Sequence, residues 1–123
     1  MVAPENSGWE LALNYSETAT GAARLASRMI SGDIGLLEGL PELHQQLREL
    51  GEFDKGDFSG DFAALSFMLL DIEPYLPAAG GEANEQAARW VPTVVARHRL
   101  NVLEACRRVV ARYAAQESTL KRA

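Results

Sequence analysis

The stretch TVVARHRLNVLEACRRVVARYAAQ, residues 93–116, carries the clearest structural pattern in the chain. At about 100° per residue, apolar side chains gather on one side of a helix and charged side chains on the other. The apolar face holds Val95, Val102, Cys106, Val109, Val110 and Tyr113, and the opposite face holds Arg97, Asn101, Glu104, Arg108 and Arg112. Such a helix is stabilised mainly by burying its apolar face, so the rest of the chain must supply helices that cover it.

Two further segments show the same helical period. Residues 7–30 place Leu11, Ala12, Tyr15, Ala19, Ala22, Ala26 and Met29 on one face, and the small alanines allow a partner helix to approach closely. From about residue 59, a stripe of Phe58, Phe62, Leu65, Leu69 and Ile72 is joined by Phe67, Met68 and Leu70 around most of the circumference. A helix that is apolar nearly all round is normally buried, so we expect this one at the centre of the fold.

Glycine and proline divide the remaining chain. Residues 33–50 are expected to hold a short turn of helix, a break at Gly39 and a helix that begins at Pro41. A further helix from about residue 82 is expected to be interrupted at Pro92, and Trp90 to be a packing anchor. Because no segment alternates with period two, we predict an all-α fold. It should be a compact bundle of about four to six helices, with residues 1–123 forming a single domain.

Length and composition exclude several classes of protein. A chain of 123 residues and 13.4 kDa makes one domain, and its single cysteine, Cys106, excludes an internal disulfide and fits a reducing compartment. No apolar run approaches the ~20 residues of a membrane span, and the N-terminus has no secretory pattern. The net charge of −5 disfavours nucleic acid. We therefore expect a cytoplasmic protein that binds neither membranes nor nucleic acid.

Catalytic and metal-binding motifs are missing from the sequence. The two histidines, His44 and His98, and Cys106 do not stand at a ligand spacing, so no metal site is expected. The acids of the loop 54–61 lack the alternation of a calcium-binding loop, and the glycines at 32, 35 and 39 lack the context of a phosphate cradle. We expect no cofactor and assign no catalytic residue, which favours a protein that is not an enzyme.

Charge is distributed unevenly along the chain. Residues 1–85 carry 15 acidic and four basic residues, whereas residues 86–123 carry two acidic and eight basic ones. Either the basic last helix pairs with acidic neighbours, or the two surfaces steer a charged protein partner. The candidate partner-surface residues are Arg97, Arg108 and Arg112 on the basic side and Asp54, Asp57 and Asp61 on the acidic side.

Two charged residues fall in apolar sectors of their predicted helices. Asp71 projects with Phe67, and Arg99 lies among the apolar residues of the last helix. Since an unpaired buried charge costs several kcal/mol, an Asp71–Arg99 or Glu73–Arg99 ion pair is expected to tie two helices together. The alternative is a polar ligand pocket between helices, lined by Asp71, Glu73 and Arg99 with Tyr15 or Tyr75.

A set of short motifs resembles a family. Ser31-Gly32-Asp33, Glu38-Gly39, Asp57-Phe58, Phe62, Glu73, Leu76-Pro77 and Trp90 together resemble a small bacterial all-helical family of unknown function, over about residues 22–97. The chain departs from the family pattern by an additional proline, Pro74. The resemblance implies a helical, cytoplasmic bacterial domain with no established activity, and it carries over no catalytic residue.

These observations lead to three functional hypotheses. The first is a non-enzymatic module that binds another protein, in the manner of acidic immunity proteins or antitoxins that cap basic enzymes. The second is a helical bundle that binds or converts a small molecule in an interhelical polar pocket. The third is a structural subunit that assembles into a homo-oligomer.

Overall fold

The chain folds into helices joined by turns and loops. The computed structural model describes residues 3–75 and 85–122, and the side chains of residues 14–75 and 89–114. Its elements are α1 (Ala3–Ser31), α2 (Leu36–Glu49), α3 (Ala63–Ile72), the short 3₁₀-helix η1 (Glu73–Tyr75) and α4 (Glu85–Arg122). No strand occurs within these described ranges. The predicted all-α bundle is therefore confirmed.

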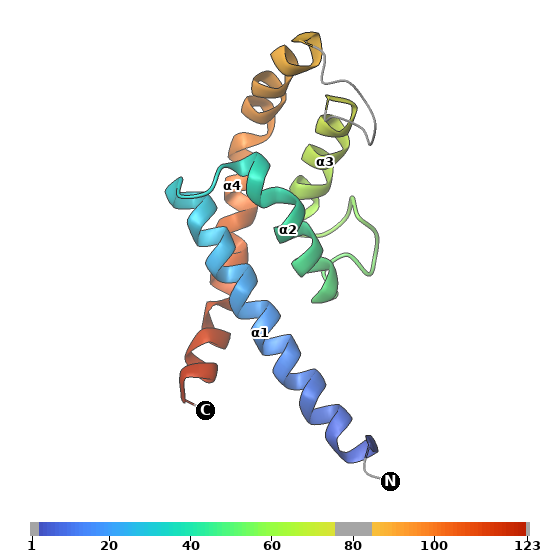
Figure 1. Ribbon diagram of the computed structural model, residues 1–123, viewed down its shortest axis with the longest axis vertical. Helices are drawn as coiled ribbons and strands as arrows, with labels where there is room; N and C mark the ends of the chain where they lie inside the picture. Colours follow the sequence, from blue (N-terminus) through green and yellow to red (C-terminus); the bar gives the residue numbers. More distant parts are fainter. Residues whose placement is uncertain (1–2, 76–84, 123) are drawn as a thin grey trace.

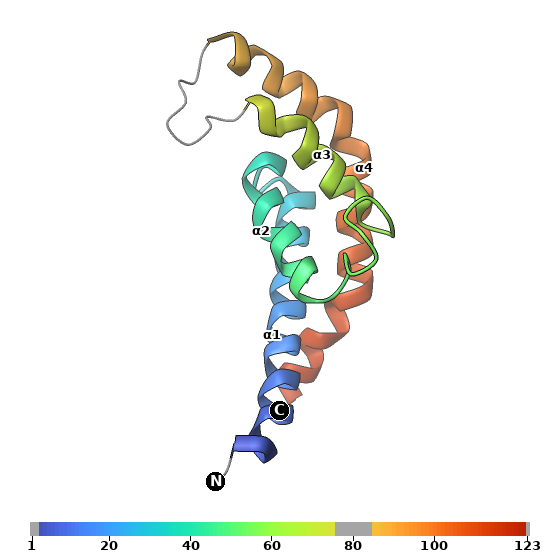
Figure 2. The same ribbon diagram turned by 90° about the vertical axis from the view of Figure 1, so that its right-hand side faces the viewer.

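The helices run alternately up and down the molecule. α4 descends from the top of the view, and α1 rises antiparallel to its lower half from below the end of α4 (Figures 1 and 2). α2 lies beside α1, while α3 lies along the upper half of α4 (Figures 1 and 2). The lower half of α4 is thus covered mainly by α1, and its upper half by α3.

The core forms where the small face of α1 meets the apolar face of α4. Ala19, Ala22, Ala23 and Ala26 of α1 are buried in one cluster with Val102, Cys106, Val109 and Tyr113 of α4. Leucines of α2 and α3 complete the same cluster. The apolar faces predicted for these two long helices are thus the ones that the fold buries.

One continuous helix spans residues 36–49, so the predicted break at Gly39 and the helix start at Pro41 are wrong. Gly39 is buried, and a Cβ atom there would lie 2.6 Å from Met29 Sδ. The glycine therefore lets α2 approach α1 closely and does not interrupt the helix. Pro41 removes one backbone hydrogen bond, but burial of Leu40, Leu43 and Leu47 keeps the helix in place.

The predicted interruption at Pro92 is also wrong, because α4 continues from Glu85 to Arg122. Proline has a helical φ value, so it removes one hydrogen bond without requiring a turn. Val94, two residues later, is buried where α4 packs against α3. Packing against α3 thus holds the helix on the C-terminal side of the proline.

α3 is not the buried centre of the fold. It begins at Ala63, later than predicted, and leaves Phe58 in the preceding loop. Leu65, Met68 and Ile72 are buried, but Phe67 is 46% and Leu70 is 52% exposed. α3 packs on α4 and touches α2, and no other described helix covers its remaining face.

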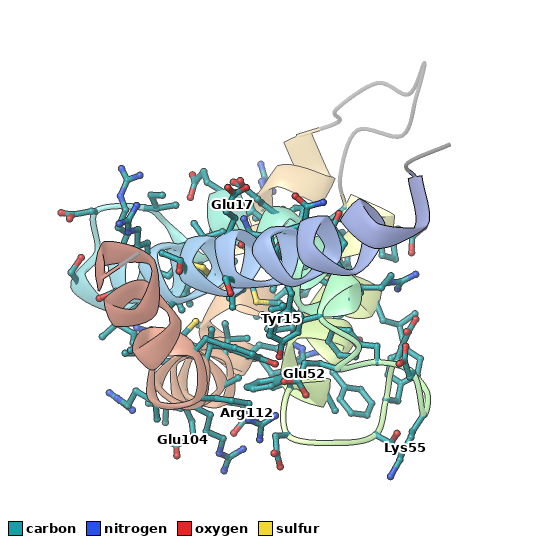
Figure 3. The ribbon with its side chains drawn as sticks, turned by 90° about the horizontal axis from the view of Figure 1, so that it is seen from below. Tyr15, Glu17, Glu52, Lys55, Glu104 and Arg112 are labelled. Carbon is teal, nitrogen blue, oxygen red and sulfur yellow. The ribbon has the colours of Figure 1, made fainter. Side chains whose placement is uncertain are left out.

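The loop between α2 and α3 is held against α4 by a cluster of charged and aromatic side chains. Arg112 of α4 donates to both oxygens of Glu52 at 2.8 Å and also binds Asp61. Its guanidinium carbon lies 4.8 Å from the centre of the buried Phe62 ring, and Tyr113 donates to Glu52. Figure 3 shows Arg112 and Glu52 facing one another. One arginine therefore fixes both ends of the loop.

A pair of glycine substitutions tests the close approach of α1 and α2. Gly39→Ala should lower the free energy of unfolding by about 1–2 kcal/mol, because the new methyl group overpacks against Met29. Gly21→Ala, whose Cβ would lie 3.4 Å from Gln46 Nε2, should raise it by about 0.5–1 kcal/mol through helix propensity. Urea unfolding followed by circular dichroism measures both. Equal effects of the two variants would contradict the proposed packing.

The arginine that anchors the loop gives a second test. Arg112→Lys should lower the free energy of unfolding by about 1 kcal/mol, because an ammonium group cannot make paired hydrogen bonds to Glu52 and still reach Asp61. Arg107→Lys is the matched control, since the ion pair that Arg107 makes among the described residues is with the exposed Glu104 on its own helix. It should change stability by less than about 0.5 kcal/mol in the same urea titration. A loss of equal size in both variants would show that the loop cluster contributes nothing specific.

Candidate functional site

Large apolar side chains are exposed along one side of α3 and its neighbours. Phe58, Phe67, Leu70 and Trp90, here called the apolar strip, are each about half exposed. The centroids of the Phe58 and Phe67 rings lie 5.0 Å apart. Leu70 lines two separate hollows, which are described below. Trp90 is predicted to be a packing anchor, but its side chain is 55% exposed. It lines one of the hollows together with the buried Val94. Contiguous apolar surface of this kind is typical of a binding site.

The first hollow, here called the Trp90 hollow, has a volume of about 330 Å³ and lies between α3, η1 and α4. Leu70, Tyr75 and Trp90 supply its apolar walls, and Asp71 and Arg97 its charges. Asp71 Oδ2 accepts a hydrogen bond of 2.6 Å from His98 Nε2 and lies 4.0 Å from Arg97 Nη1. The carboxylate is thus oriented from α4, and its charge is balanced within the hollow.

The second hollow, here called the Phe58 hollow, has a volume of about 290 Å³ and also has Leu70 in its wall. Phe58, Leu69 and Leu70 form its apolar wall. Its polar residues include Glu73, from η1, and an ion pair of 3.3 Å between Arg48 and Asp57. The residues of this hollow come from three separate parts of the chain.

A buried histidine and serine pair lies at the base of the Phe58 hollow. His44 Nε2 and Ser66 Oγ share a hydrogen bond of 2.9 Å, and the His44 ring stacks on Phe53 at 4.5 Å. Burial, helped by the neighbouring Arg48, lowers the pKa of His44, while Asp57 opposes the shift. The two residues lie 22 positions apart on different helices, so no local sequence motif predicts their contact.

This pair lacks the other parts of a hydrolytic site. Asp57 binds Arg48 and is not hydrogen-bonded to His44, so no carboxylate orients the ring among the described residues. Ser66 is the fourth residue of α3, so its own backbone N–H group is used by a hydrogen bond within the helix. The pair therefore satisfies two buried polar groups and joins α2 to α3.

The predicted pocket residues are divided among different sites. Asp71 and Tyr75 meet in the Trp90 hollow, whereas Glu73 lines the Phe58 hollow. Tyr15 lies on α1 on the side of Glu52 (Figure 3) and helps to raise the pKa of Tyr113, which is raised mainly by burial and by Glu52. These residues therefore do not form the single pocket that the sequence suggested.

The expected ion pairs of Arg99 with Asp71 or Glu73 are wrong. Asp71 is bound by His98 and Arg97, and Arg99 is exposed. α1 ends opposite the middle of α4, so it does not extend along the upper half of that helix (Figures 1 and 2). A polar link between α3 and α4 does exist, but it is made by Arg97 and His98, the two residues before Arg99, with Asp71.

Much of the predicted charged surface is paired internally. Arg112 binds Asp61 and Glu52, and Arg108 donates to the backbone oxygen of Asp61 at 3.3 Å. The first alternative for the uneven charge, pairing of the basic helix with acidic neighbours, therefore applies to this region. Asp54 is exposed and lines a third hollow, of about 470 Å³, within the loop that Arg112 anchors.

The cysteine and the other potential metal ligands contribute no further site. Cys106 is fully buried, and burial raises the pKa of its thiol to about 11, so a reactive thiolate is disfavoured. Among the described residues, no group of three or more metal-ligating side chains comes together.

Comparisons with protein-family models, with curated proteins and with solved structures give no match. The resemblance to a bacterial helical family therefore stays a prediction. In the part of the chain that the structure describes, no helix combines the length and apolar character needed to cross a membrane.

The lowered pKa of His44 predicts how stability depends on pH. Above the ordinary histidine pKa of 6.5, the ring is neutral in both folded and unfolded chains. Below 6.5 the unfolded chain takes up a proton that the folded chain does not, so the free energy of unfolding should fall. Urea titrations from pH 7.5 to 5.5 measure this slope, which should be smaller in His44→Gln. Identical slopes in wild type and variant would contradict the assignment.

Proposed function

We propose that this chain is a non-enzymatic module that binds an amphipathic helix of a partner protein through the apolar strip. The supporting observation is the strip itself: Phe58, Leu70 and Trp90 are half exposed and line two hollows, and the half-exposed Phe67 packs against Phe58. Helices recognise such surfaces by placing apolar side chains, three or four residues apart, into successive hollows. Leu70, between the two hollows, would be the centre of the contact.

The size and chemistry of the strip suit a protein partner. Full burial of a leucine or phenylalanine contributes about 1.5–3 kcal/mol, and the half-exposed residues of the strip have a substantial part of this still to gain. Aromatic anchors such as Trp90 and Phe67 are frequent hot spots of interfaces. The pairing of Arg108 and Arg112 with the loop makes the charged faces a weaker candidate. The net charge of −5 favours a basic partner, as in an immunity- or antitoxin-like protein.

A second candidate function rests on the Trp90 hollow alone. Asp71 and Tyr75, two residues expected to line a ligand pocket, meet there with Arg97. The volume of about 330 Å³ lies at the lower limit of small-molecule sites, which span ~300–1,000 Å³. A ligand in this hollow would shift the NMR signals of Tyr75 and Trp90 but not that of Phe58, whereas a helix on the strip would shift all three.

Site-specific crosslinking tests the proposed function. A photoreactive phenylalanine analogue is placed at Leu70 or, as the matched control, at Leu100, which is 80% exposed but lines neither described hollow. We expect a partner crosslinked from Leu70 and not from Leu100. The identified partner is then purified, and its binding to Leu70→Lys should be weakened by about 2 kcal/mol, with Leu100→Lys unchanged.

Three outcomes would contradict the proposal. Equal crosslinking from both positions would mean that the contact is not specific to the strip. Crosslinks only between copies of this chain would support the homo-oligomer instead. A partner that binds Leu70→Lys as tightly as the wild type would place the interface elsewhere.

A further inference from the structure

We infer that the Phe58 hollow receives a lysine or arginine side chain of the partner, while the Trp90 hollow receives an uncharged one. This inference rests on the proposed function and specifies the chemistry of the bound helix. The two hollows share Leu70 as a wall residue and differ in the charged residues that line them. A helix that fits both can therefore bind in only one direction.

Among the residues that the structure describes, those lining the Phe58 hollow include one carboxylate, that of Glu73, without an ion-pair partner. The charges of Arg48 and Asp57 neutralise one another at 3.3 Å, and the buried His44 shares a hydrogen bond with Ser66. Glu73 is exposed and has no ion-pair partner among the residues that the structure describes. A cation placed beside it would gain an ion pair without displacing an existing one.

The walls of this hollow suit the stem of a long basic side chain. Lysine and arginine pack their methylene groups on apolar surface while their charged ends reach a polar partner. Phe58 and Leu70 offer such a surface on the side of the strip, and Leu69 extends it. The exposed ring of Phe58 can also bind a guanidinium group through its face.

The Trp90 hollow does not favour a basic side chain, because Asp71, the one carboxylate among its described lining residues, is already bound by His98. Asp71 receives a hydrogen bond of 2.6 Å from His98 and lies 4.0 Å from Arg97, so an added cation would face the guanidinium group. Trp90 and Tyr75 form an aromatic wall with Leu70. An apolar or aromatic side chain fits these surroundings best.

Selection from a library of helical peptides provides the test. A display library with randomised positions on one helix face is selected against the full chain, and the enriched peptides are measured against variants. We expect one position to be enriched in lysine or arginine, next to apolar positions. Glu73→Gln should weaken these peptides about two- to fivefold, the effect of an exposed ion pair. The matched control Glu42→Gln, which changes an exposed glutamate that lines neither hollow, should leave affinity unchanged.

The outcomes separate this inference from the proposed function. Peptides that lose affinity in Leu70→Lys but show no basic position and bind Glu73→Gln normally would overturn the inference and leave the strip as the binding surface. Peptides that bind Leu70→Lys as well as the wild type would overturn the proposed function. A charge reversal, Glu73→Lys, should shift selection at the same position toward aspartate or glutamate.

Discussion

The structure depends first on the contact between the alanine face of α1 and the apolar face of α4. Ala19, Ala22 and Ala26 are fully buried there, and their small side chains let the two backbones approach closely. The contact covers only the lower half of α4, because α1 ends where its chain turns at Gly32, with φ of +88° (Figure 1). The upper half of α4 must therefore find another neighbour, and α3 supplies it.

This division of α4 produces the candidate binding surface. α3 has ten residues and is apolar on almost every side, but among the described helices it packs on α4 and, more lightly, on α2 and the adjoining η1. Its remaining face therefore exposes Phe67 and Leu70, which join Phe58 and Trp90 in the apolar strip. In contrast, the charged side chains near the lower half of α4 are used to hold the α2–α3 loop. The apolar side chains beside the upper half of α4 are thus exposed and can bind a partner, whereas the charged side chains beside its lower half are paired with one another.

The sequence predicted the long helices well and their interruptions poorly. The buried faces of α1 and α4 follow directly from the 3.6-residue period, because a long amphipathic helix has one favourable orientation. Gly39 and Pro92 were expected to break helices, since both residues lower helix propensity. In the fold, Gly39 lies against Met29 and Pro92 precedes the buried Val94, so tertiary packing outweighs the local cost. The helical period also predicts that Arg99 lies in a buried apolar sector, but its side chain is exposed. The period of one helix contains no information on where a neighbouring helix ends.

The helical class and the buried faces of α1 and α4 can be predicted from the residue pattern alone, because both properties arise from residues within one helix. The sequence also showed the uneven charge, but not that Arg112 reaches Glu52, 60 residues away. In contrast, the packing of the helices against one another brings His98 to Asp71 and His44 to Ser66, and leaves Leu70 exposed in the walls of two hollows. These contacts join separate helices, so they depend on helix lengths, crossing points and rotations, and no local period encodes them.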